Sequence, residues 1–268
     1  MTDLLKRSLA PITDEAWKEI DAQAARILKG NLSARGLVDF SGPHGWNAAA
    51  VNTGHVKWTN AEKGKGTLWG IREALPLVEV RVPFTLKLSE LDEVPRGAKN
   101  PDLAALITAA RKMASFEEKA LYHGMPEAGI QGLAEVSTHK PIELTKDVNR
   151  FAEAVEAAVL AIEKSGIGGP YALVLGTEPY RMLMVGDPAT YPARKRVEPI
   201  TGGPAWSPAL SGGVVLSKRG GDFELTVGQD IAIGYAGHDR ETADLYFTES
   251  FTFRVLEPAA AVELKLKA

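Results

Sequence analysis

The chain has 268 residues, of which 45% are hydrophobic and 24% charged, and its formal net charge is −3. This composition is typical of a globular protein of one or two domains, and the charge balance gives no indication of nucleic-acid binding. The absence of cysteine excludes disulfides, thiolate metal sites and cysteine nucleophiles, and it fits a reducing, cytosolic setting. No stretch approaches the roughly 18 apolar residues of a membrane span, and the N-terminus lacks the apolar run of a secretory signal.

The N-terminal part of the chain predicts an amphipathic helix over residues 14–31. Trp17, Ile20 and Ile27 belong to an apolar stripe at helical spacing, and Thr13 is a suitable N-cap. Such a stripe packs on its own domain, and its groove can also receive a partner peptide. Both interpretations stay open at this point.

Residues 50–88 predict extended structure. Apolar and polar side chains alternate over 78–88, which is the pattern of a strand with one buried face. The preceding residues 51–71 predict two strands joined by a polar turn at 62–66. Because a long hairpin buries little surface by itself, we expect it to lean on something outside its own domain, such as a neighbouring subunit.

A long helix is predicted to follow the hairpin region. Asn100 is a good N-cap, Pro101 suits the first helical position, and Gly124 is expected to end the helix. The adjacent acidic residues Glu117 and Glu118 are interpreted as part of a solvated helix face.

The remainder of the chain predicts mixed α/β structure followed by strands. We expect helices over 147–164 and after Thr177, and a loop over 185–203 that contains three prolines. Strands are expected over 171–175, 213–217, 223–227, 231–236 and 245–255.

The sequence shows no catalytic constellation. No pair of its five histidines has the spacing of a helical zinc site, and the glycines miss the dinucleotide and phosphate-loop patterns. We therefore expect no bound metal, no cofactor and no enzymatic activity. A triad whose members converge only in space stays open.

Several long blocks resemble the encapsulin shell proteins, which are also called linocin-type proteins. The resemblance is colinear from end to end. It is carried by LLKRSLAPITDEAWKEID (4–21), SGPHGW (41–46), LPLVEVRVPFTLKLSELDEVPRG (75–97), GIQGL (129–133), GPYALVL (169–175), YPARKRVE (191–198), RGGDFELTVGQDIAIGY (219–235) and TESFTFRV (248–255).

The resemblance implies an α+β fold of the tailed-bacteriophage major capsid type (HK97-like). It divides the chain into a peripheral domain, an extended E-loop that pairs with an adjacent subunit, and an axial domain. The implied bounds are 1–49 (peripheral, with the N-terminal helix), 50–83 (E-loop), 84–135 (peripheral, with the spine helix), 136–219 (axial) and 220–268 (peripheral, C-terminal strands).

The same resemblance implies a cytoplasmic nanocompartment without nucleic acid or membrane, closed from about 60 copies of the chain in the simplest case. Its cargo would be a ferritin-like iron oxidase or a dye-decolorising peroxidase, held by a C-terminal targeting peptide, for iron storage or oxidative stress. The implied peptide-binding residues are Ile27, Leu28, Leu32, Arg35, Asp39, Ile231 and Tyr235. The implied five-fold pore loop is Gly186, Asp187, Pro188, Ala189, Thr190 and Tyr191.

Alternatives remain at this stage. Arg35 and Asp39 can instead pair with each other or with the chain around them. The whole protein can instead be a secreted bacteriocin or peptidase of the linocin type, or a true phage capsid protein.

Overall fold

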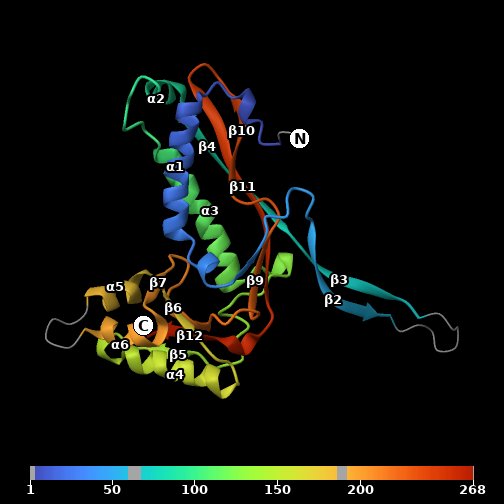
Figure 1. The fold of residues 1–268 in the computed structure, drawn as a ribbon, viewed down its shortest axis with the longest axis vertical. Coiled ribbons are helices and arrows are strands. Elements are labelled where there is room, and N and C mark those ends of the chain that lie inside the picture. Colours follow the sequence, from blue (N-terminus) through green and yellow to red (C-terminus); the bar gives the residue numbers. More distant parts are fainter. Residues whose placement is uncertain (1–3, 60–67, 186–191, 268) are drawn as a thin grey trace.

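The structure is a computed structural model that describes residues 4–59, 68–185 and 192–267. Figure 1 shows an elongated upper body, a lower body that is broader than it is tall, and a two-stranded hairpin that projects sideways from between them. Each body is built on its own five-stranded sheet. None of the described helices is long and apolar enough to cross a membrane.

The upper body is organised around one long strand, β11 (Thr242–Val255). Its first ten residues pair antiparallel with β4 (Val78–Lys87), and its last five pair with β9 (Phe223–Val227). The short β1 (Asp39–Ser41) extends the sheet beyond β9, and β10 (Ala232–His238) pairs with β11 on the edge opposite β4. Alternating apolar residues of β4 and β11 form the buried face, as the sequence predicts.

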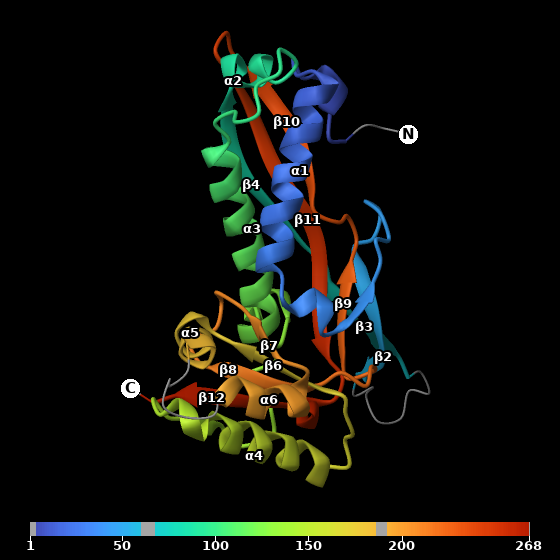
Figure 2. The ribbon, with the colours of Figure 1, turned by 60° about the vertical axis from the view of Figure 1, so that its left-hand side comes forward.

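Two helices lie on one side of this sheet (Figure 2). The first, α1 (Asp14–Asn31), has the bounds that the sequence predicts, and the Thr13 hydroxyl accepts a hydrogen bond from the Ala16 amide at 3.3 Å. The second, α3 (Ala104–His123), packs between α1 and the sheet. The short α2 (Leu88–Glu93) joins β4 to the segment that leads to α3.

The predicted start of the long helix is wrong, although its predicted end at Gly124 is confirmed. The helix begins at Ala104 rather than at Pro101, with Leu103 at its N-cap position. The Asp102 carboxylate accepts the Ala104 amide at 3.1 Å and so satisfies one of the free amides of the first turn. Asp102 is itself fixed by its own amide, which donates to Glu90 at 2.9 Å.

The lower body contains the second sheet, whose strands lie in the order β5-β12-β8-β6-β7. The strands are β5 (Ile142–Leu144), β6 (Tyr171–Leu175), β7 (Pro204–Trp206), β8 (Gly213–Ser217) and β12 (Ala261–Leu266). The helices are α4 (Phe151–Lys164), α5 (Thr177–Val185) and α6 (Ala193–Thr201).

Two predictions are corrected in this body. Much of the expected loop over 185–203 is the helix α6, because Ala193, Val197 and Thr201 recur every four residues and bury one face despite Pro199. The last strand, β12, pairs with β8 and β5 of the second sheet. Residues 261–266 therefore do not lie with the upper-body strands, where the division at 220–268 places them.

The projecting hairpin consists of β2 (Ala50–Trp58) and β3 (Gly70–Pro76). Its large apolar side chains are not packed into a core. Trp58 is 61% exposed and Ile71 is 60% exposed, and Leu68 and Trp69 are exposed as well. The turn predicted at 62–66 lies outside the described residues. The hairpin thus leaves a cluster of aromatic and aliphatic side chains in solvent, which is unusual for a monomer.

Candidate functional site

The candidate site begins where α1 ends, at a short 3-10 helix, η2 (Ala34–Gly36). Its central residue, Arg35, binds three carboxylates from other segments through its guanidinium group. The Nε and Nη2 atoms donate to Glu117 at 2.9 and 2.6 Å, and Nη1 donates to Asp230 at 2.8 Å. Nη2 also donates to Glu249. One arginine thus joins a helix, a strand and the turn before β10.

The electrostatics of this cluster are unusual because Glu117 and Glu249 are both fully buried. Burial raises the pKa of Glu249 well above its ordinary value, and the negative charge of Glu117 raises it further, against the opposing effect of Arg35. Although burial disfavours the charge of Arg35, its hydrogen bond to Glu117 and the nearby carboxylates raise the pKa of Arg35. The arginine therefore stays charged.

A second buried carboxylate network lies one residue further along α3. Glu118 accepts hydrogen bonds from the Ala34 amide at 2.9 Å and from the hydroxyls of Ser33 and Ser207, each at 2.6 Å. Burial raises the pKa of Glu118, although these three donors lower it. Because Ser207 follows β7, this carboxylate links the upper body to the lower body.

These buried acids correct the interpretation of Glu117 and Glu118 as a solvated face, and the sequence did contain the signal. Met113, Ala114 and Leu121 continue the apolar face of α3, and both glutamates lie on that face. Glu249 likewise occupies an inward position in the alternating pattern of β11, between Phe247 and Phe251. A charged residue at a position where the helix or strand pattern places apolar side chains predicts a buried group that has a bonding partner.

The structure brings together most of the predicted peptide-binding residues. Ile27 and Leu28 are half-buried on the last turns of α1 and pack against the core, and Leu32 directly follows that helix. The Ile231 amide donates to Asp230 at 2.8 Å, and Asp230 in turn binds Arg35, which places Ile231 beside η2.

Tyr235 and Asp39 lie apart from that group. The Tyr235 amide donates to the Leu5 carbonyl oxygen at 2.8 Å, and its hydroxyl bonds to His238. Tyr235 therefore contacts the segment that precedes α1. Asp39 lies on β1 and accepts the Gly221 amide at 2.5 Å. Arg35 and Asp39 therefore pair with the chain around them rather than with each other. The predicted pore loop, Gly186 to Tyr191, lies outside the described residues.

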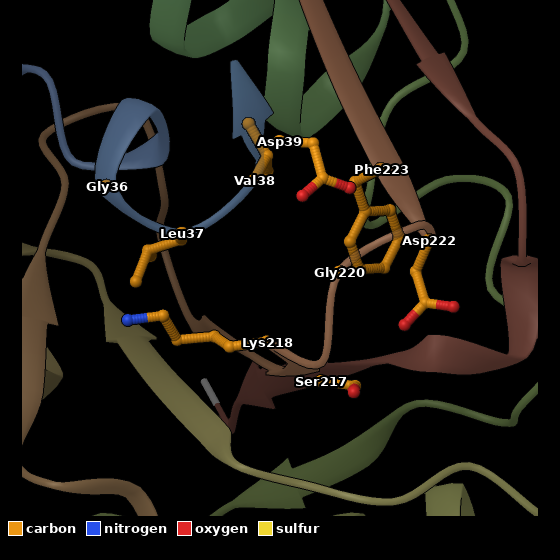
Figure 3. Close-up of a pocket in the computed structure, with 9 residues that line it drawn as sticks. All are labelled: Gly36, Leu37, Val38, Asp39, Ser217, Lys218, Gly220, Asp222 and Phe223. Atoms are coloured by element: carbon orange, nitrogen blue, oxygen red, sulfur yellow. The ribbon is translucent and has the colours of Figure 1, made fainter.

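Asp39 lines a small cavity of about 110 Å³ at the junction of the two bodies. Figure 3 shows its carboxylate pointing to the loop that carries Gly220, whereas the Lys218 side chain extends toward Leu37 and the Asp222 carboxylate points elsewhere. Asp222 is bound by Arg219 at 2.7 Å. The charged groups do not converge on one point, so this cavity offers no acid–base pair to a substrate.

The histidines also have structural partners. The Nε2 atoms of His123 and His139 bond to the carbonyl oxygens of Ala209 and Ala259, each at 2.9 Å. Within residues 4–59, 68–185 and 192–267, no group of three or more histidine, aspartate or glutamate side chains could hold a metal ion.

Comparison with known proteins gives consistent results over nearly the whole chain. The family described as "Encapsulating protein for peroxidase" matches residues 1–252. The type 1 encapsulin shell protein of Rhodospirillum rubrum is 43% identical, with 99% of this chain and 97% of that protein covered. The type 1 encapsulin shell protein of Mycobacterium tuberculosis is 37% identical, with 97% and 98% covered.

Solved structures show the same fold at low sequence identity. A virus-like particle from Pyrococcus furiosus superposes with a TM-score of 0.64 at 14% identity, covering 93% of this chain and 99% of that one. Mycobacterium phage Adephagia gives a TM-score of 0.57 at 12% identity, covering 89% and 91%. The predicted α+β capsid fold of the HK97 type is thereby confirmed.

Proposed function

The chain belongs to the family of type 1 encapsulin shell proteins, and we propose that it assembles with further copies of itself into a closed shell that encloses a cargo enzyme. The observation that carries this proposal is the hairpin of β2 and β3. Trp58, Trp69 and Ile71 are exposed on an arm that projects from both bodies. A second copy of the chain would bury these side chains, and their removal from water would stabilise the assembly.

The cargo-binding site is assigned to the end of α1. Half-buried aliphatic side chains suit a short peptide tail with apolar anchors, and the site offers four of them: Ile27, Leu28, Leu32 and Ile231. Arg35 uses all three of its guanidinium nitrogens on its own chain. It is therefore a positioning residue that holds η2 in place.

Polar recognition of the tail is assigned to carboxylates at the rim of this site. The side chain of Asp230 is 43% exposed although one of its oxygens binds Arg35, so it can accept a further hydrogen bond from a peptide amide. Asp39 is exposed as well, but its carboxylate is bound to the Gly221 amide. We therefore expect Asp230 to contribute more than Asp39.

The family name favours a peroxidase as the cargo, since the matching family is described as encapsulating one. Of the two cargo classes, we therefore propose a dye-decolorising peroxidase over a ferritin-like iron oxidase, and oxidative stress over iron storage as the context. The residues 186–191 are proposed as the pore through which small substrates enter.

The assembly is tested on the purified full chain by sedimentation velocity and electron microscopy. We expect hollow particles of megadalton mass, whereas a single subunit-sized species would overturn the proposal. Native mass spectrometry of particles from the source cells then identifies the contents. A co-purifying peroxidase would support the proposed cargo, whereas a co-purifying iron oxidase would show that the cargo belongs to the other class. Packaged nucleic acid would indicate a phage capsid protein instead.

The binding site is tested by the substitution Leu28→Asp in cells that express the chain together with a cargo protein. A charge among these aliphatic side chains should abolish cargo capture while shells still form. Ala25→Asp is the matched control, because Ala25 lies on the exposed side of the same helix. Equal cargo loading in the two variants would show that the tail binds elsewhere.

A further inference from the structure

The lower body carries an exposed acidic and apolar stripe on α4. Glu153, Glu156, Leu160 and Glu163 recur at helical spacing on its solvent side, and Leu160 is 50% exposed. Arg150 pairs with Glu153 at 3.3 Å, and Glu163 accepts the Tyr171 hydroxyl at 3.4 Å. Glu156 is thus the carboxylate beside Leu160 that is best placed to meet an external partner.

A shallow apolar notch lies on α5 in the same body. Tyr180, Met184 and Val185 line it together with Trp206, whose indole nitrogen donates to Thr177 at 3.2 Å. Met184 and Val185 are exposed, although Leu183 on the same helix is buried. Arg181 is the charged residue of the lining. The notch therefore suits an apolar side chain that is accompanied by a carboxylate.

The stripe and the notch lie toward opposite ends of the second sheet. The helix α4 packs on β5, β12 and β8, whereas α5 packs on β6 and β7. Both helices also contact α6, which separates Leu160 from the notch of its own molecule. A second molecule can supply it.

From this complementarity we infer that Leu160 of one copy inserts into the α5 notch of the next copy, where Glu156 pairs with Arg181. The inference rests on the proposed function and deepens it, because it names one of the contacts by which copies join. A contact between the same surface on both copies is disfavoured, because it would place the two acidic stripes, or the two Arg181 side chains, against each other. The contact is therefore head-to-tail, and a contact of this kind closes into a ring or continues as a filament.

The first test uses Leu160→Asp and Met184→Asp in the full chain. Each should lower the fraction of protein in particles by about tenfold or more in sedimentation velocity, because a charge would enter the buried contact. Leu256→Asp is the matched control, since Leu256 is 48% exposed and follows β11, outside both α4 and the lining of the notch. Circular dichroism checks that all three variants are folded.

The second test exchanges the charges. Glu156→Arg and Arg181→Glu should each reduce assembly, and the double variant should restore it. In addition, a mixture of Leu160→Asp and Met184→Asp chains should form more pairs than either variant alone, because each mixed pair retains one intact Leu160 and one intact notch.

Particles that form from both single aspartate variants as readily as from the wild type would overturn this contact and leave the proposed shell intact. Failure of the charge exchange to restore assembly would equally overturn the pairing of Glu156 with Arg181. A wild-type chain that forms no particles would instead overturn the proposed function itself.

Discussion

Glu117 on α3 and Glu249 on β11 bind the same guanidinium group, that of Arg35, although both carboxylates are fully buried. Two buried carboxylates that share one cation cannot both ionise without a large cost in free energy. The raised pKa of Glu249 follows from its burial and from the charge of Glu117. The folded protein therefore binds a proton at Glu249 more tightly than the unfolded chain does.

This proton makes the stability depend on pH. The contribution of Glu249 is fully present below the ordinary glutamate pKa of about 4.3, and it is lost as the pH rises through the raised pKa of the folded state. Glu249→Gln, which needs no proton, should flatten the fall in thermal stability that begins as the pH rises above the ordinary glutamate pKa. Thermal unfolding followed by circular dichroism measures this. The exposed Glu143→Gln is the control, and parallel pH profiles for wild type and Glu249→Gln would contradict the prediction.

Removal of the Arg35 side chain should lower the free energy of unfolding. Arg35→Ala leaves Glu117 and Glu249 buried without their cation, which is expected to destabilise the fold by about 3–5 kcal/mol. Arg35→Lys should recover only part of this, because an ammonium group cannot reproduce the forked contacts to three carboxylates. Urea denaturation of both variants gives the two values. A cost below about 1 kcal/mol for Arg35→Ala would show that the cluster contributes little.

Glu118 should control the junction of the two bodies. Glu118→Ala removes the acceptor for Ser33, Ala34 and Ser207 and leaves buried donors unpaired, each at a cost of about 1–3 kcal/mol. We expect faster amide hydrogen exchange around residues 33–36 and 207–210, with little change in α4. Uniformly faster exchange across both bodies would instead indicate general destabilisation.

The hairpin should contribute to assembly rather than to the stability of the subunit. Trp58→Ala and Trp69→Ala remove exposed rings, so thermal unfolding of unassembled chains should be almost unchanged. The yield of particles should fall by about tenfold, since aromatic side chains at interfaces carry much of the binding energy. Sedimentation velocity measures the yield, and unchanged yields for both variants would exclude the two rings from subunit contacts.

The sequence predicted much of the local structure because local rules govern it. The 3.6-residue period and the Thr13 cap gave both ends of α1, and period-two alternation located β4 and β11. Local rules failed where packing outweighed propensity. The prolines around α6 favoured a loop, but burial of Val197 made the segment helical.

The sequence by itself determined the family, the order of most elements and the lack of a recognisable catalytic motif, because these depend on residues close together in the chain. Only the tertiary structure decided that β12 joins the second sheet and that Arg35 meets Glu117, Asp230 and Glu249. These partners lie 82, 195 and 214 residues away along the chain. Contacts over such separations are set by how the two sheets and their helices pack, and no local pattern encodes them.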